Sequence, residues 1–202
     1  MTGTDASRWM EIQSLARDEQ LVAELHRLGV EHLARFQSDA AHASLAPDDV
    51  IGALAAHPQA RFRSSLILLF LRRPSFSRLV PQALTRLDLA AATALRLYYQ
   101  AAVYLRPELE DELRRHSDDV APLPDLFSAE LGLPAPGSLP AGAALDALGD
   151  LHHRLSGQTY NWAGSYRQHI PLFLRQLKRH AHLAPQRPRW LCVGERLDVV
   201  QL

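Results

Sequence analysis

The sequence predicts an all-α fold, a multi-helix bundle around a central apolar helix at about residues 87–105. Two observations lead to this prediction. Apolar residues recur three or four positions apart through most of the chain, which is the spacing of one face of an α-helix. Prolines and glycines stand mainly where such stretches begin or end, as they do at helix ends. The hydrophobic share of 47% allows a sizeable core, and 202 residues fit one domain.

The central helix is predicted from the most apolar part of the chain, residues 64–105. In its second half the polar groups form a narrow ridge of Asp88, Arg96 and Gln100. The apolar face consists of Leu87, Ala91, Leu95, Tyr98, Ala102 and Leu105. A helix with so narrow a polar ridge must be covered on most of its sides, so we place it at the centre of the bundle.

Shorter helices are predicted ahead of the central one. Residues 5–28 show helical periodicity, and Gly29 stands where a C-cap glycine belongs. Another helix is expected over about residues 30–41. Pro47 and Pro58 each open a further helix, because proline is tolerated in a first helical turn.

The connection to the central helix follows from the next prolines. The helix that begins at Pro58 runs through an apolar stretch to Arg73. Ser75 begins a short helix, which we expect Pro81 to bend or end because proline lacks a backbone N–H. Asp88 is predicted to cap the central helix.

The chain becomes more irregular after the central helix. Pro107 opens a short acidic helix, and another is predicted over residues 124–131. Residues 133–142, LPAPGSLPAG, predict a linker or long loop because proline and glycine are frequent there. We therefore expect a main helical body over residues 1–132 and a C-terminal part, residues 143–202, that packs on it as one domain.

This C-terminal part is predicted to be a helical hairpin followed by a tail. Its first helix spans residues 143–155 and ends near Gly157. Its second helix spans about residues 165–182, with Pro171 bending its first part. Residues 190–200 contain β-type side chains around a glycine, which predicts either a small β-hairpin tail or an extended tail.

The composition limits the cellular location and the covalent cross-links that we expect for this chain. A single cysteine, Cys192, excludes an internal disulfide framework. No apolar run reaches about 18 residues without a charge, so we expect no membrane span. The N-terminus resembles no secretory signal, which leaves the cytoplasm as the expected location. Of the 22 basic residues, 21 are Arg, which we attribute to a GC-rich bacterial genome.

Neither a cofactor nor a metal site is expected. No glycine pattern beside a strand resembles a phosphate-binding loop. The histidines considered as metal ligands are His152, His153, His180 and His182. No pair among them has the i, i+4 spacing that places two imidazoles on one helical face, and no carboxylate lies between Asp150 and Glu195.

The charges cancel overall but are segregated along the chain. Residues 50–87 contain six Arg and no acid, and residues 151–194 contain seven cations and no acid. From these blocks we select as candidate anion-binding residues Arg61, Arg63, Arg78, Arg154, Arg167, Arg175, Lys178 and Arg179. The aromatic residues that could stack on unpaired bases are Tyr160, Trp162, Tyr166 and Trp190.

Three interpretations of these blocks remain open. The cations could form one positive face for a polyanion such as nucleic acid, whose phosphates attract Lys and Arg. They could instead pair with the acidic blocks, within the fold or across a homodimer. They could also be simple solvated faces. We favour a non-enzymatic interaction or regulatory protein, a homo-oligomer whose partner is nucleic acid or an acidic protein surface.

The alternative function is enzymatic. Arg175 and His180 have an Arg-x4-His spacing near the end of a predicted helix. This spacing resembles the active-site motif of HEPN-domain ribonucleases, which are helical and usually dimeric. The resemblance implies that Arg175 would steady phosphate charge and His180 would handle the 2′-hydroxyl. The chain departs from the family at Gln176, where Asn, Asp or His is typical.

Overall fold

The computed structural model describes residues 18–31, 33, 45–116, 119, 121–158 and 160–183, with backbone alone for residues 180–183. Within these residues the secondary structure is helical and contains no strand, which confirms the all-α prediction. Residues 18–27 are helical. The elements that follow are α2 (Pro47–Ala56), α3 (Ala60–Arg72), η1 (Pro74–Leu79), α4 (Val80–Leu84), α5 (Leu89–His116), α6 (Ala141–Ser156), α7 (Trp162–Arg167) and α8 (Ile170–Leu183). Most of the helix expected over residues 30–41 and the predicted 190–202 tail lie outside the described residues.

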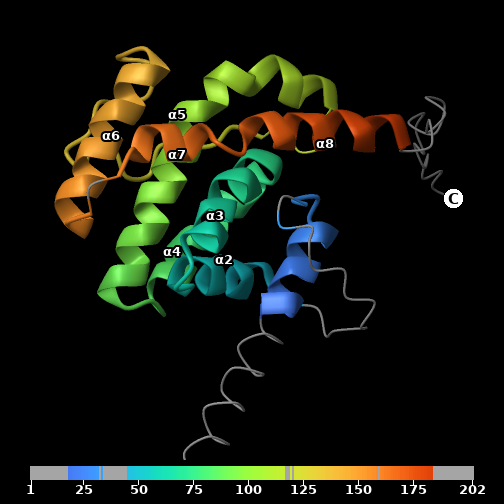
Figure 1. The fold of residues 1–202 in the computed structure, drawn as a ribbon, viewed down its shortest axis with the longest axis horizontal. Helices are drawn as coiled ribbons and strands as arrows, with labels where there is room; N and C mark the ends of the chain where they lie inside the picture. The colour runs from blue at the N-terminus through green and yellow to red at the C-terminus, as the bar shows by residue number, and fades with distance from the viewer. Residues whose placement is uncertain are drawn as a thin grey trace, which may run out of the picture.

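Helix α5 is the centre of the bundle, as predicted, and packs against α2, α3, α6 and α8 (Figure 1). Asp88 caps it, since its Oδ1 accepts the backbone N–H of Ala91 at 2.8 Å. The helix is longer than expected because Pro107 lies inside it rather than at the start of a separate helix. Figure 1 shows α5 bending in its second half, which agrees with the lost backbone hydrogen bond at an internal proline.

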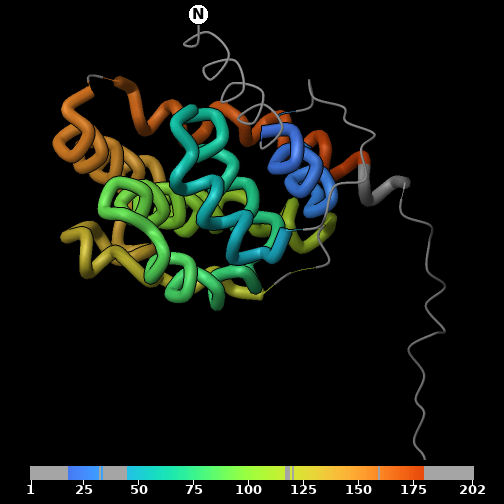
Figure 2. Tube along the Cα trace, turned by 90° about the horizontal axis from the view of Figure 1, so that it is seen from below, coloured from blue at the N-terminus to red at the C-terminus, as the bar shows by residue number. Residues whose placement is uncertain are grey.

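The core lies between α3 and α5. All residues of α3 from Ser64 to Arg72 are buried, and the rings of Phe70 and Tyr99 meet edge to face at 4.8 Å. Figure 2 shows α2 and α3 against one side of α5 and α6 against another. Both views place the helix at residues 18–27 near the end of α8, where Glu31 and Arg179 form an ion pair. No helix among the described residues is both long and apolar enough to cross a membrane.

The region between α5 and α6 differs from the prediction. In place of a helix over residues 124–131, the structure has a turn at 127–132 that ends at Gly132, with φ of +65°. Prolines on both sides of this turn limit it, because each removes a backbone donor that a helix would use. The predicted single helix over 165–182 is likewise divided into α7 and α8, just ahead of Pro171.

Side chains of α5 hold this irregular segment against the helix. The hydroxyl of Tyr99 donates to the carbonyl of Pro124 at 2.8 Å, and that of Tyr104 donates to the carbonyl of Pro134 at 2.5 Å. A guanidinium nitrogen of Arg106 donates to the carbonyl of Ala121 at 2.6 Å. The segment therefore gains fixed contacts without regular structure of its own.

This arrangement predicts the effect of Tyr99→Phe. The ring would keep its contacts with Phe70 and Phe127, so the change removes only the hydrogen bonds of the hydroxyl, to the carbonyl of Pro124 and with Ser77. We expect the free energy of unfolding to fall by about 1 kcal/mol, measured by urea denaturation. Tyr160→Phe is the control, because Tyr160 is 57% exposed, and it should leave the free energy of unfolding unchanged.

Candidate interaction groove

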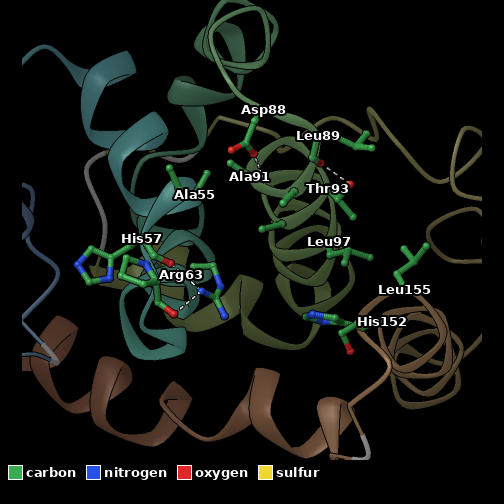
Figure 3. Close-up of a pocket in the computed structure, with 15 residues that line it drawn as sticks. Ala55, His57, Arg63, Asp88, Leu89, Ala91, Thr93, Leu97, His152 and Leu155 are labelled. Carbon is green, nitrogen blue, oxygen red and sulfur yellow. Dashed lines mark hydrogen bonds between the residues drawn. The ribbon is translucent and has the colours of Figure 1, made fainter.

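A cavity of about 720 Å³ lies between the α2–α3 corner, the first half of α5 and the end of α6 (Figure 3). Its floor is made by α5, which presents Ala90, Ala94 and Leu97 on successive turns. Ala55 and Ala56 contribute from the end of α2. We call this cavity the groove. Its lining is mainly apolar and is built from small side chains, so another molecule could approach the backbone of α5 closely.

Arg63 is the cation of the groove. It lies in the first turns of α3, and its Nη1 donates to the carbonyls of His57 at 2.6 Å and Pro58 at 2.7 Å. Burial raises the pKa of Tyr98, while the charge of Arg63 and a hydrogen bond from it act in the opposite direction. Among the described residues no carboxylate forms an ion pair with Arg63. Its position is therefore fixed by neutral partners, and its charge remains available to a ligand.

His152 faces Arg63 from α6 on the opposite wall (Figure 3). Its ring stacks on Trp162, with centroids 3.6 Å apart, and its Nδ1 lies 2.8 Å from the hydroxyl of Tyr166. Burial lowers the pKa of His152 to about 4, and the charge of Arg63 adds to this effect. The imidazole is therefore neutral at pH 7 and serves the packing of α6 on α7.

Gly149 allows α7 to carry Trp162 and Tyr166 to this position. A Cβ at residue 149 would lie 3.2 Å from the backbone nitrogen of Ala163 and 3.5 Å from the Cβ of Trp162. The side chain of Asn161 accepts the backbone N–H of Gly164 at 2.8 Å and caps α7. Close packing and a polar cap together place a six-residue helix firmly on α6.

The edges of the groove carry exposed leucines. Leu89, at the start of α5, is 84% exposed, and Leu155, at the end of α6, is 55% exposed. Figure 3 shows them beside the groove together with Asp88, which lies at the end opposite to Arg63 and His152. The groove thus combines an apolar floor, apolar edges and one cation at one end. This combination suits an amphipathic ligand that carries a negative charge.

The other titratable groups of the groove have structural partners. The Nε2 of His57 lies 2.9 Å from Oδ1 of Asp18, and its Nδ1 accepts the backbone N–H of Gln59. Asp88 caps α5. Among the described residues no group of three or more His, Cys, Asp or Glu is arranged to hold a metal ion.

Several of the predicted anion-binding cations pair with carboxylates of the same chain. Arg167 lies 3.0 Å from Glu108, and Lys178 lies 3.1 Å from Glu112. Arg179 forms an ion pair with Glu31. These contacts match the interpretation in which the blocks pair within the fold, and they tie α7 and α8 to elements far away in sequence.

The remaining cations from the prediction have other surroundings. Arg61 donates to the Oε1 of Gln59 and lies over the ring of Phe62, with its Cζ 5.3 Å from the ring centroid. Arg78 is exposed and donates to the carbonyl of Ser75. Arg154 and Arg175 are exposed, and neither of these two forms an ion pair with a carboxylate among the described residues. Arg63, Arg78, Arg154 and Arg175 are thus distributed over α3, η1, α6 and α8.

The aromatic residues selected for base stacking do not act together. Trp162 is 6% exposed and Tyr166 is 2% exposed, because both form the packing between α6 and α7. Their faces are covered by His152 and Tyr98, so in this fold they offer no surface to a base. Tyr160 is exposed, and Trp190 lies outside the described residues.

The Arg-x4-His pair lies on α8, where Arg175 is exposed and the side chain of His180 lies outside the described residues. Gln176 is buried. The chain matches no protein-family model, no curated protein and no solved structure. The groove and the cations are therefore the features of the chain that bear on its function.

Proposed function

We propose that the protein is a non-enzymatic interaction protein that binds an acidic segment of a partner protein. The observation that carries the proposal is that some cations have carboxylate partners within the described part of the chain, whereas Arg63 does not. Arg167, Lys178 and Arg179 are neutralised by carboxylates of the same chain. Arg63, in contrast, is held by two backbone carbonyls beside exposed apolar side chains. A guanidinium held in this way can form paired hydrogen bonds with a carboxylate of another molecule.

A protein partner is favoured over nucleic acid. Phosphate backbones are bound by rows of cations, and several cations of the predicted set already have carboxylate partners. Trp162 and Tyr166 are buried, which removes two of the rings that could stack on bases. A groove with an apolar floor suits side chains of a protein better than a phosphate backbone.

A binding role is favoured over catalysis because the titratable groups of the groove have structural roles. The ring of His152 stacks on Trp162 and contacts the hydroxyl of Tyr166, and the ring of His57 contacts the carboxylate of Asp18. A homo-oligomeric state and a location in the bacterial cytoplasm remain expectations from the sequence. The segregated charges support the first, and the Arg-rich composition supports a bacterial source.

The test is a selection of random phage-displayed peptides on the immobilised full chain. We expect the enriched peptides to contain Asp or Glu, and their binding to weaken as salt rises from about 50 to about 300 mM, because exposed charges are screened. A variant with Arg63, Arg78, Arg154 and Arg175 changed to Gln should lose this binding. The matched control changes four paired cations, Arg114, Arg115, Arg167 and Arg179, to Gln and should keep it.

Two results would contradict the proposal. One is the absence of any enrichment over the bare support. The other is tighter binding of single- or double-stranded oligonucleotides than of the enriched peptides at about 150 mM salt, where weak surface attraction is largely screened. The second result would assign Arg63, Arg78, Arg154 and Arg175 to nucleic acid.

A further inference from the structure

The groove has the shape of a position in a helical bundle that one further helix could fill. Helix α5 forms its floor, the α2–α3 corner forms one wall and the end of α6 forms the other (Figure 3). The floor and one wall present the methyl groups of Ala55, Ala90 and Ala94, so a helix laid there could approach α5 closely. Large side chains on the arriving helix could then occupy the volume that the alanines leave.

The edges of the groove expose the apolar surface that such a helix would cover. Leu89, at the start of α5, is 84% exposed, and Leu155, at the end of α6, is 55% exposed. A packed helix would remove both from water together with the alanine floor. Apolar side chains gathered around a cavity in this way are typical of a protein-binding surface.

The charges at the two ends of the groove favour one orientation of a bound ligand. Arg63 lies at one end of the groove, and its guanidinium is held in place by the carbonyls of His57 and Pro58. Asp88 lies at the other end and is itself negative. A carboxylate of the ligand is therefore attracted to the Arg63 end and repelled from the Asp88 end.

We infer that the groove binds an amphipathic α-helix of a partner protein, with a carboxylate on its apolar face paired to Arg63. This inference rests on the proposed function and names the form of its partner. The floor from Asp88 to Leu97 is about 14 Å long at 1.5 Å per residue, which matches two to three turns of the bound helix. A helix is favoured over an extended strand because the described residues contain no sheet edge that could pair with one.

The experiment uses the full chain and the acidic peptides enriched in the selection above. Ala90→Trp fills the groove from an exposed position of α5, and Ala129→Trp adds the same side chain at an exposed position outside the groove. Binding is measured by fluorescence polarisation, and the helix content of the bound peptide by circular dichroism. We expect Ala90→Trp and Arg63→Gln each to weaken binding about tenfold or more, Ala129→Trp to leave it unchanged, and the peptide to gain helix on binding.

The contrary results separate the inference from the proposed function. If no acidic peptide is enriched, the proposed function fails, and the inference fails with it. If acidic peptides bind Ala90→Trp as tightly as the unaltered chain, the proposed function stands and the groove is not their site. Enriched peptides that bind without gaining helix would overturn the helical form. Displacement of bound peptide by decanoate below its micelle concentration would assign the groove to a small amphipathic anion instead.

Discussion

Trp162→Ala is expected to destabilise the protein by about 3–5 kcal/mol, the range for removal of a large buried aromatic side chain. Trp162 is 6% exposed, and its indole ring stacks on His152 with an angle of 13° between the ring planes. The substitution would leave a cavity between α6 and α7, and α7 is too short to form a stable helix without tertiary contacts. Denaturant unfolding followed by circular dichroism would measure the loss.

Trp162→Phe is the matched control for this prediction. The Nε1 of Trp162 is buried without a hydrogen-bond partner among the described residues, so phenylalanine removes an unsatisfied donor while keeping an aromatic face on His152. We expect this change to alter the free energy of unfolding by less than about 1.5 kcal/mol. A loss below about 1 kcal/mol for Trp162→Ala would show that α7 contributes little to stability, contrary to its packing.

The fold class could be predicted from sequence because helical periodicity is a local property. The first helix after the loop, expected over residues 143–155, is found at Ala141–Ser156 and ends at Gly157, whose φ is +64°. Its start and end depend on residues close in sequence, so the pattern was sufficient. At Pro107 the same reasoning was wrong, because the tertiary contacts of Leu109 and Leu113 maintain the helix beyond the proline.

The groove could not be predicted, because its walls come from separate parts of the chain. Arg63 and His152 meet only after α3 and α6 pack on α5. The structure exposes Leu155 and buries His152, although leucine is the more apolar of the two side chains. His152 shares a face with Leu145 and Leu148 at helical spacing, and this polar residue in an apolar series was the available signal.

The charge blocks, too, could be identified from the sequence, whereas the ion-pair partners of their residues could not. Arg167 stands in a stretch without acids, yet its partner Glu108 lies 59 positions away in the sequence. Absence of acids nearby in sequence therefore does not leave a cation unpaired in the fold. Arg63 differs because it lies at a chain corner, where backbone carbonyls rather than carboxylates surround its guanidinium.

Stability is expected to decrease as the pH falls from about 6.5 to about 4, because His152 is buried in its neutral form. Its pKa in the folded state is lowered to about 4 by burial and by the nearby charge of Arg63, whereas an unfolded histidine titrates near 6.5. Within this window the unfolded state binds more protons than the folded state, so acid favours unfolding. The contribution is fully present above pH 6.5 and is lost at about 1.4 kcal/mol per pH unit, up to about 3 kcal/mol in total.

The comparison of two neighbouring histidines isolates this effect. His152→Gln removes the titrating group and should give a shallower dependence of the free energy of unfolding on pH between about 4 and 6.5, although it also lowers stability at neutral pH by disturbing the contact with Tyr166. His153→Gln changes an exposed histidine on the same helix and should keep the slope of the unaltered protein. His169, whose pKa is also lowered by burial, is present in all three proteins and so does not distinguish them. Equal slopes in the two variants would show that His152 is not held neutral between Trp162 and Tyr166, and the packed wall of the groove would need another explanation.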